Sequence, residues 1–306
     1  MRAVRFHEFG DPDVLMLEEA PEPHAGAGQV RIRVQAAGVN PADAKLRSGI
    51  LHDTMPAKFP AIFPSIPGID SAGVVDEVGE GVTGVSLGDR VFGLAAADGT
   101  TAEFAVLSAW ARIPSTWSFE QAAAAALVAQ TATIALDVLG ELEGKTILVD
   151  GAAGGVGSTV VEFALARGAT VIGTASPARH EFLRSLGAEP TTYGAGLAGR
   201  VASLSVNNVH GALDMVGAGS LAELVAIVGD SSRVVTIADP NAPALGVAFV
   251  GGNANASANL AAAVELGEKG SYSPRVSAVF PIEQTASAHR EIQTGHTQGK
   301  IVVTVP

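Results

Sequence analysis

The sequence contains no cysteine among its 306 residues. Disulfide bonds, thiolate nucleophiles and cysteine-ligated zinc are therefore excluded. Aromatic residues are also scarce, at 5% of the chain, and charged residues make up only 16%, whereas apolar residues reach 47%. This balance predicts a chain that buries a globular core and is not disordered.

Positive charge is in short supply, with 19 Lys and Arg against 31 Asp and Glu and a formal net charge of −12. No block of Lys or Arg stands out, so we expect neither nucleic acid nor an anionic membrane surface as a partner. An anionic ligand must then be held by a local site against the overall field.

Long hydrophobic runs are missing as well. Residues 1–8 lack the apolar core of a signal peptide. The longest apolar run, 122–136, is rich in alanine and interrupted by Gln130, Thr131 and Thr133, so it reads as too short and too polar to span a bilayer. We therefore expect a buried helix here, and a cytoplasmic protein with no membrane partner.

The pattern of elements changes along the chain. Up to about residue 115 it is rich in strands, with apolar and polar residues alternating over 30–34 and glycine-bounded runs at 73–79 and 90–93. From Ser118 onward helices and strands alternate with short connections, which predicts a parallel sheet covered on both faces. The expected strands are 146–149, 170–173, 212–216 and 233–237, and the expected helices are 158–167, 177–186 and 220–228.

The end of the chain is expected to form a helix after about residue 259, then a strand at 275–280, a helix at 282–294 and a strand at 300–305. Periodicity leaves two arrangements open. These elements either extend the parallel sheet or return to the first domain.

A glycine-rich turn, Gly151 to Gly157, lies between the strand 146–149 and the helix 158–167. A pyrophosphate needs close backbone approach, free N–H donors and the positive end of a helix, and this arrangement offers all three. A tight strand-to-helix turn without a ligand is the alternative. We predict a dinucleotide held by Ala153, Gly154, Gly155, Val156 and Gly157.

The end of the second strand distinguishes NAD from NADP. No acid that could grip a ribose 2′-hydroxyl appears before Glu181. Ser176 offers a hydroxyl and Arg179 a guanidinium that suits phosphate, so we predict NADPH. Alternatively, Ser176 caps the helix 177–186, with Pro177 at its first position, and Arg179 is solvated. The two roles of Ser176 are compatible.

Several further motifs, in order along the chain, carry a family resemblance. They are Ala36–Asp43, Pro67–Val75, Gly88–Gly93, the glycine turn, Leu186–Ala188 with Tyr193 after it, and Gly299–Val302. With them the chain resembles the medium-chain dehydrogenase/reductase superfamily, in particular its zinc-free quinone oxidoreductase branch, which includes zeta-crystallin-like proteins.

The resemblance implies an α/β fold of two domains. A GroES-like, β-rich catalytic domain would comprise residues 1–119, completed by 259–306. A Rossmann domain with a doubly wound parallel sheet, residues 120–258, would bind the cofactor. The resemblance also implies a homodimer joined through edge strands of the cofactor domains.

Departures from the zinc-dependent members of the superfamily are informative. Those enzymes carry a Cys where this chain has Asn40 and a His-Glu pair where it has Ile69-Asp70, and their four-cysteine lobe is absent here. Isoleucine cannot ligate zinc and an amide is a poor ligand, so we expect no metal. Without Lewis-acid polarisation, the resemblance favours an acceptor that is already electron-poor, a quinone or an α,β-unsaturated carbonyl.

The resemblance also assigns side chains. Asn40 would donate to the acceptor oxygen, unless it is only a turn residue before Pro41. His52 could supply a proton, or be merely solvated. The further cofactor-binding residues that the resemblance implies are Thr131, Tyr193, Ile237, Ala238, Val250 and Lys300. For Thr131 a satisfied helix residue, for Tyr193 core packing and for Lys300 a solvated lysine are the alternatives.

The expected function is an NADPH-dependent reductase that transfers hydride to a quinone or an enone. Two alternatives stay open. One is a low-turnover NADPH-binding sensor or structural protein, since no strong proton donor stands out. The other is an enoyl-thioester reductase, which needs a basic approach for its CoA or phosphopantetheine arm that the local charges do not provide.

Overall fold

The computed structural model describes residues 1–205, 208–252 and 255–306. Its internal contacts divide the chain into two compact units. Unit 1 comprises residues 1–127, 256–268 and 273–306, and unit 2 comprises 128–255 and 269–272. The chain therefore leaves unit 1 after residue 127 to form most of unit 2, returns at 256, and leaves once more for the short segment 269–272.

Unit 1 is built on a mixed sheet in the order β13-β14-β3-β4-β5-β6, and β3 also pairs with β6. The last four strands of this order, β3 to β6, therefore close on themselves. The strands are β3 (Val30–Val39), β4 (Asp70–Val78), β5 (Arg90–Ala95), β6 (Phe104–Arg112), β13 (Val276–Pro281) and β14 (Lys300–Thr304). A separate antiparallel pair joins β1 (Arg2–Arg5) to β2 (Met16–Glu19).

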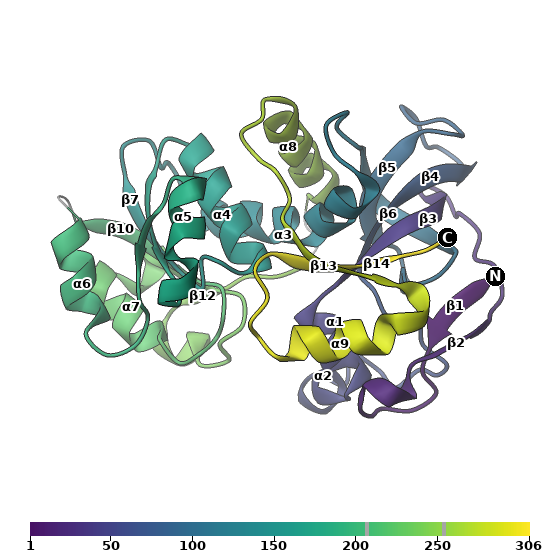
Figure 1. Cartoon of the computed structure of the whole chain (residues 1–306), viewed down its shortest axis with the longest axis horizontal. Helices are drawn as coiled ribbons and strands as arrows, with labels where there is room; N and C mark the ends of the chain where they lie inside the picture. Colours follow the sequence, from purple (N-terminus) through teal and green to yellow (C-terminus); the bar gives the residue numbers. More distant parts are fainter. Residues whose placement is uncertain (206–207, 253–254) are drawn as a thin grey trace. The chain divides into compact units, whose positions relative to one another are not determined.

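The C-terminal strands belong to this first sheet. β14 lies antiparallel to β3, with Ile301 opposite Val39, and β13 pairs with β14 in parallel (Figure 1). Of the two arrangements left open by periodicity, the return to the first unit is therefore the correct one. The helices of unit 1 are α1 (Pro41–Arg47), α2 (Ile50–Thr54), α8 (Ala256–Glu268) and α9 (Thr285–Gln293), together with the first part of α3 (Phe119–Val138).

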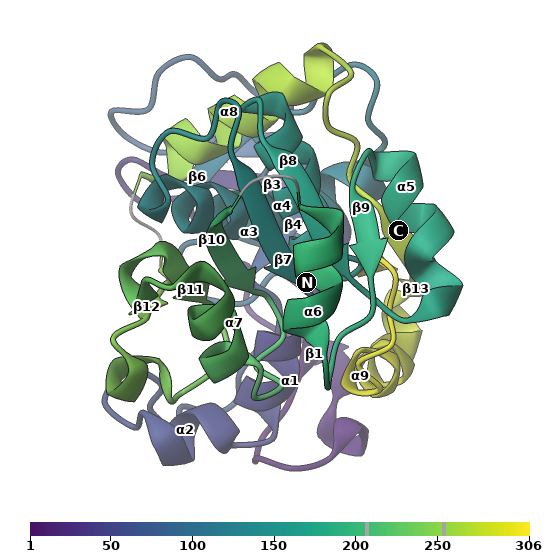
Figure 2. The same cartoon turned by 90° about the vertical axis from the view of Figure 1, so that its left-hand side faces the viewer.

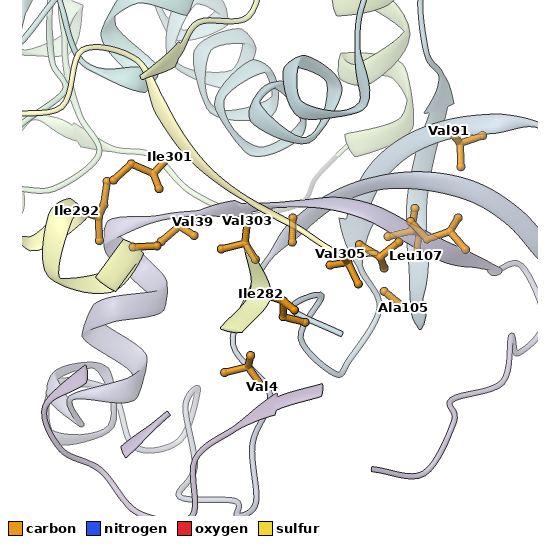
Figure 3. Packing of buried hydrophobic residues seen from close by; sticks show 14 of the residues in the cluster. Val4, Val39, Val91, Ala105, Leu107, Ile282, Ile292, Ile301, Val303 and Val305 are labelled. Carbon is orange, nitrogen blue, oxygen red and sulfur yellow. The ribbon is translucent and has the colours of Figure 1, made fainter. Parts of the chain in front are cut away.

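The core of unit 1 follows from strand periodicity. Val30, Ile32 and Val34 on β3 are fully buried, which confirms the alternation expected there. They pack with apolar residues of β1, β14 and the 3₁₀ turn Ile282–Gln284, among them Val4 and Ile282 (Figure 3). Each such side chain contributes about 1.5–3 kcal/mol on burial, so residues from both ends of the chain stabilise one core.

Unit 2 is the expected parallel sheet, in the order β12-β11-β10-β7-β8-β9. Figure 2 shows β9 and β12 at its opposite edges. The strands are β7 (Thr146–Asp150), β8 (Thr170–Thr174), β9 (Glu189–Thr191), β10 (Val209–Asp214), β11 (Val234–Thr236) and β12 (Ala248–Phe249). The helices that follow them are α4 (Gly155–Ala166), α5 (His180–Leu186), α6 (Leu197–Leu204) and α7 (Leu221–Val228).

Some elements differ from the expectation. α4 begins at Gly155, three residues early, because Gly154 takes the N-cap position. β10 begins at Val209, where His210 and Gly211 interrupt the apolar pattern. β9 and α6 were not anticipated, since β9 is only three residues long and contains Pro190, which an edge strand tolerates.

Helix α3 has 20 residues, and by length and composition alone it could cross a membrane. It is longer than the run identified in the sequence, so length does not exclude a span. About 67% of its most apolar window is buried within the protein, however. Ala122 to Ala126 are fully buried, as expected for a core helix.

Candidate functional site

Four polar side chains end the central strands of unit 2. Asp150, Thr174, Asp214 and Thr236 are the last residues of β7, β8, β10 and β11, and all four are buried. The chain proceeds to one side of β7 through β8 and β9, and to the other through β10 to β12. The carboxyl ends of β7 and β10 therefore flank a topological switch point, where open α/β sheets bind their ligands.

Hydrogen bonds lock this edge of the sheet. Asp150 accepts from the Thr174 hydroxyl and, at 2.5 Å, from the Ser220 hydroxyl. Thr174 Oγ1 in turn accepts from the Gly151 N–H at 3.0 Å. The first residue of the glycine turn is thus tied to two neighbouring strands.

The glycine turn does not accept a side chain at every position. Gly151 adopts a left-handed φ of +76°, and a Cβ at Gly157 would overlap the Gly151 carbonyl oxygen. A Cβ at Gly154 would meet only that same oxygen, at 3.4 Å. The first N–H groups of α4, at Gly155 to Gly157, need no partner within the helix and suit a phosphate. Ala153, just before them, is buried.

Ser176 and Arg179 follow β8 on a short 3₁₀ turn, Pro177–Arg179. Ser176 is the N-cap of this turn with Pro177 after it, yet its side chain makes no capping hydrogen bond. Its hydroxyl is therefore not used for capping, in contrast to the alternative considered above. Arg179 is partly buried, whereas Glu181 is exposed and lies 3.8 Å from Arg184.

The other predicted cofactor residues of unit 2 are surface or edge positions. Tyr193 lies two residues beyond β9 and is 61% exposed, so core packing is wrong for it. Thr131 lies half-buried on α3. The N–H groups of Ile237, Ala238 and Val250 donate within the chain, to Asp214 O, Thr236 Oγ1 and Thr236 O respectively. Their carbonyl groups are left as the possible ligand contacts.

In unit 1, Asn40 directly follows β3 and caps α1. Its N–H donates to Asp43 Oδ2 at 2.8 Å, and the two side chains form a capping box. This explains the local sequence, because Asn40 satisfies the helix start and Pro41 occupies the first helical position.

Asn40 is only 3% exposed, and its amide is fully engaged. Nδ2 donates to Asp43 Oδ2 at 3.1 Å and to Asp70 Oδ1 at 2.7 Å, and Oδ1 accepts from Lys300 Nζ. Lys300 is 5% exposed and its Nζ lies 3.6 Å from Asp70 Oδ2, so it is not a solvated lysine. The structure thus brings together Asn40 and Lys300, which the sequence analysis treated separately.

Asp70 was not among the predicted site residues. It accepts the Leu127 N–H at 3.2 Å besides its bonds to the Asn40 cluster. Its position in Ile69-Asp70, in place of the His-Glu pair, was the one available signal. Burial, with the neighbouring Asp70 carboxylate, raises the pKa of Asp43 to about 6.

His52 lies on α2 and is half-buried, not fully solvated. Its Nδ1 lies 3.0 Å from the Phe59 carbonyl oxygen, and its ring centroid lies 5.3 Å from that of Phe9. Because a carbonyl can only accept, Nδ1 carries the hydrogen and the lone pair of a neutral ring is on Nε2. Among the residues that the structure describes, no three His, Asp or Glu side chains group as metal ligands would.

Comparison with known proteins defines the family. Residues 26–117 match the alcohol dehydrogenase GroES-like domain, and residues 186–303 match the zinc-binding dehydrogenase family. A quinone oxidoreductase of Rattus norvegicus is 30% identical over 98% of this chain and 96% of its own length. The chain belongs to the medium-chain dehydrogenase/reductase superfamily, in its quinone oxidoreductase branch. It is therefore an oxidoreductase, and the predicted combination of a GroES-like and a Rossmann domain is confirmed.

Other members of the superfamily show its range. A 2-methylene-furan-3-one reductase of Solanum lycopersicum is 32% identical over 99% of this chain and 79% of its own. Three solved structures each align over all of this chain and 99–100% of their own. They are the quinone oxidoreductase of Coxiella burnetii (TM-score 0.87, 30% identity), a mycobacterial protein in complex with NADPH (0.84, 28%) and the CurK enoyl reductase (0.89, 25%).

Proposed function

We propose that this oxidoreductase uses NADPH to reduce a quinone or an α,β-unsaturated carbonyl, without a metal. The observation that carries the proposal is the carboxyl edge of the unit 2 sheet. There a glycine turn at the start of α4 lies beside Ser176 and Arg179, with no acid at the end of β8. The mycobacterial relative in complex with NADPH supports the choice of cofactor.

The residues present fit this dinucleotide. The N–H groups of residues 155–157 would hold the pyrophosphate, while Ser176 and Arg179 would hold the 2′-phosphate. Tyr193 and Thr131 would contact the sugar and phosphates, and carbonyl groups of Ile237, Ala238 and Val250 would accept from the carboxamide. NADPH supplies the hydride when bound. The protein supplies orientation and exclusion of water.

Asn40 and His52 are the proposed catalytic residues, and Lys300 a further cofactor contact. The geometry attaches a condition to Asn40, which can donate to an acceptor oxygen only by releasing Asp43 or Asp70. Lys300 has three N–H donors, of which one binds Asn40 and another faces Asp70. His52 can use its Nε2 without losing its bond to Phe59.

Two measurements test the proposal. Oxidation of NADPH is followed with a panel of quinones and enones, and turnover with at least one acceptor is expected. In Arg179→Met the Kd for NADPH should rise roughly 10- to 100-fold while that for NADH stays unchanged, because one charge-assisted contact to the 2′-phosphate is lost. Equal affinity of the unsubstituted protein for the two cofactors would contradict the assignment of NADPH.

The likeness to CurK, named as an enoyl reductase, favours one second candidate, reduction of an enoyl thioester. The test adds the crotonyl thioester of N-acetylcysteamine to the same assay as an alternative substrate and compares its kcat/KM with those of the quinones. A larger kcat/KM for the thioester would favour this candidate. Tight NADPH binding with no turnover of any acceptor would instead favour the low-turnover sensor or structural role.

The proposal extends to organisation. We propose a catalytic domain of residues 1–119 with 259–306, a cofactor domain of 120–258, a homodimer and a cytoplasmic location. Sedimentation of the purified protein at micromolar concentration tests the dimer, and a single monomer boundary would reject it.

A further inference from the structure

The loop 192–196, which connects β9 to α6, has little to hold it in shape. Residues 193–196 are exposed, and Gly194 and Gly196 adopt left-handed φ angles of +82° and +80°. One backbone hydrogen bond, from Leu197 N to Gly194 O, closes its end. Because glycine loses more backbone entropy on ordering than other residues, such a loop needs a further restraint.

A single side chain provides that restraint. Arg200, in the first turn of α6, donates from Nη1 to Ala195 O at 2.8 Å. Its Nη2 donates to the carbonyl oxygens of Thr192, Gly194 and Tyr193 at 2.9, 3.0 and 3.3 Å. One guanidinium therefore gathers four consecutive carbonyl groups. The planar fork of arginine can do this, whereas the point-like ammonium of lysine cannot span them.

The restrained loop carries Tyr193 at the edge where the ligand is expected. β9 pairs in parallel with β8, so that Thr191 lies opposite Thr174 and both strands end at the same edge as β7. Tyr193 thus follows β9 at the edge where Ser176 follows β8. Its ring is 61% exposed, and a large aromatic ring exposed at a ligand-binding edge is suited to stacking on a ligand.

We propose that Arg200 is a positioning residue for the cofactor. It holds the loop 192–196 so that Tyr193 presents its ring to the adenosine end of NADPH, and it acts through Tyr193 without touching the ligand. This inference rests on the proposed function, because it takes NADPH as the ligand of this edge.

The test is a double-mutant cycle on NADPH affinity, measured by fluorescence titration. Arg200→Met and Tyr193→Ala should each raise the Kd about tenfold. The double variant should bind NADPH no more weakly than the weaker-binding single variant, because Arg200 acts through the tyrosine.

Arg200→Lys should recover only part of the affinity lost in Arg200→Met. At saturating NADPH, kcat should stay unchanged while KM for NADPH rises. The matched control is Arg184→Met, which replaces an exposed arginine of α5 that lies beside Glu181 and should leave the Kd for NADPH unchanged.

The outcomes distinguish a failure of the role proposed for Arg200 from a failure of the proposed function. Unchanged affinity in Arg200→Met or in Tyr193→Ala, or single effects that multiply to about 100-fold in the double variant, would reject the role of Arg200 while the proposed function stands. Failure of the unsubstituted protein to bind NADPH would reject the proposed function. Hydrogen exchange shows whether folding is intact. In Arg200→Met the Leu197 amide, which donates to Gly194 O, should exchange faster while those of β7 and β8 keep their protection.

Discussion

Lys300 places one ammonium group in the interior of unit 1, against the Asn40 amide and the Asp70 carboxylate. β14 sets this contact, because Ile301 pairs with Val39 and so brings Lys300 beside Asn40. The zinc-dependent relatives have metal ligands at the positions of Asn40 and Ile69. Here the side chain of a C-terminal strand supplies the positive charge next to Asp70.

Removing that charge should be costly. Lys300→Met leaves Asp70 buried without its cation, and we expect a loss of about 3–5 kcal/mol in the free energy of unfolding, measured by urea denaturation at pH 7. Asp70→Asn should also destabilise, because it leaves a buried ammonium. The double variant Lys300→Met/Asp70→Asn should lose less than the sum of the two. Strict additivity would show that Lys300 and Asp70 do not interact.

At the scale of the element, two glycines of the glycine turn differ in what they are needed for. Gly157 is required by the fold, whereas Gly154 is expected to matter for binding. A Cβ at Gly157 overlaps the Gly151 carbonyl oxygen, whereas one at Gly154 makes a 3.4 Å contact. The φ of Gly154, −76°, is open to any residue. Steric reasons for glycine are therefore strong at position 157 and weak at 154.

The two glycines should respond differently to alanine. Gly157→Ala should lower the melting temperature by several degrees, since overpacking costs about 1–3 kcal/mol. Gly154→Ala should keep the melting temperature and lower the affinity for NADPH, because its methyl group fills the space next to the expected pyrophosphate. A Gly154→Ala variant that binds NADPH normally would place the phosphates elsewhere.

The elements also show what a sequence can predict. Apolar periodicity was sufficient for β3, β7 and β8, and the glycine turn was recognisable from its flanking strand and helix. β9 was too short to produce a pattern. The contact of Lys300 with Asn40 joins residues 260 positions apart. It depends on the return of β14 to the first sheet, which periodicity left undecided.

At the scale of the whole molecule, two buried groups should contribute to the pH dependence of stability in opposite directions. Burial, together with nearby Arg47, lowers the pKa of His289 to about 4. The unfolded chain takes up this proton near pH 6.5, so His289 lowers stability as the pH falls from 6.5 to 4. The pKa of Asp43 is raised to about 6. Below it the folded chain holds a proton that the unfolded chain releases, so Asp43 lowers stability as the pH rises from 3.8 to 6.

The difference between the ordinary pKa and the pKa in the folded protein corresponds to roughly 3 kcal/mol for each group over its pH window. The two contributions therefore nearly cancel between pH 4 and 6 in the unsubstituted protein. In His289→Asn the opposing contribution is gone, so this variant should gain about 3 kcal/mol relative to the unsubstituted protein between pH 6.5 and 4, whatever its loss at pH 7. Asp43→Asn should gain a similar amount of stability relative to the unsubstituted protein as the pH rises from 4 to 6.

Urea denaturation at half-unit pH steps measures both effects. The control is His24→Asn, which replaces an exposed histidine. Parallel stability curves for His289→Asn and the unsubstituted protein would show that His289 titrates equally in both states, and that its burial does not keep it neutral.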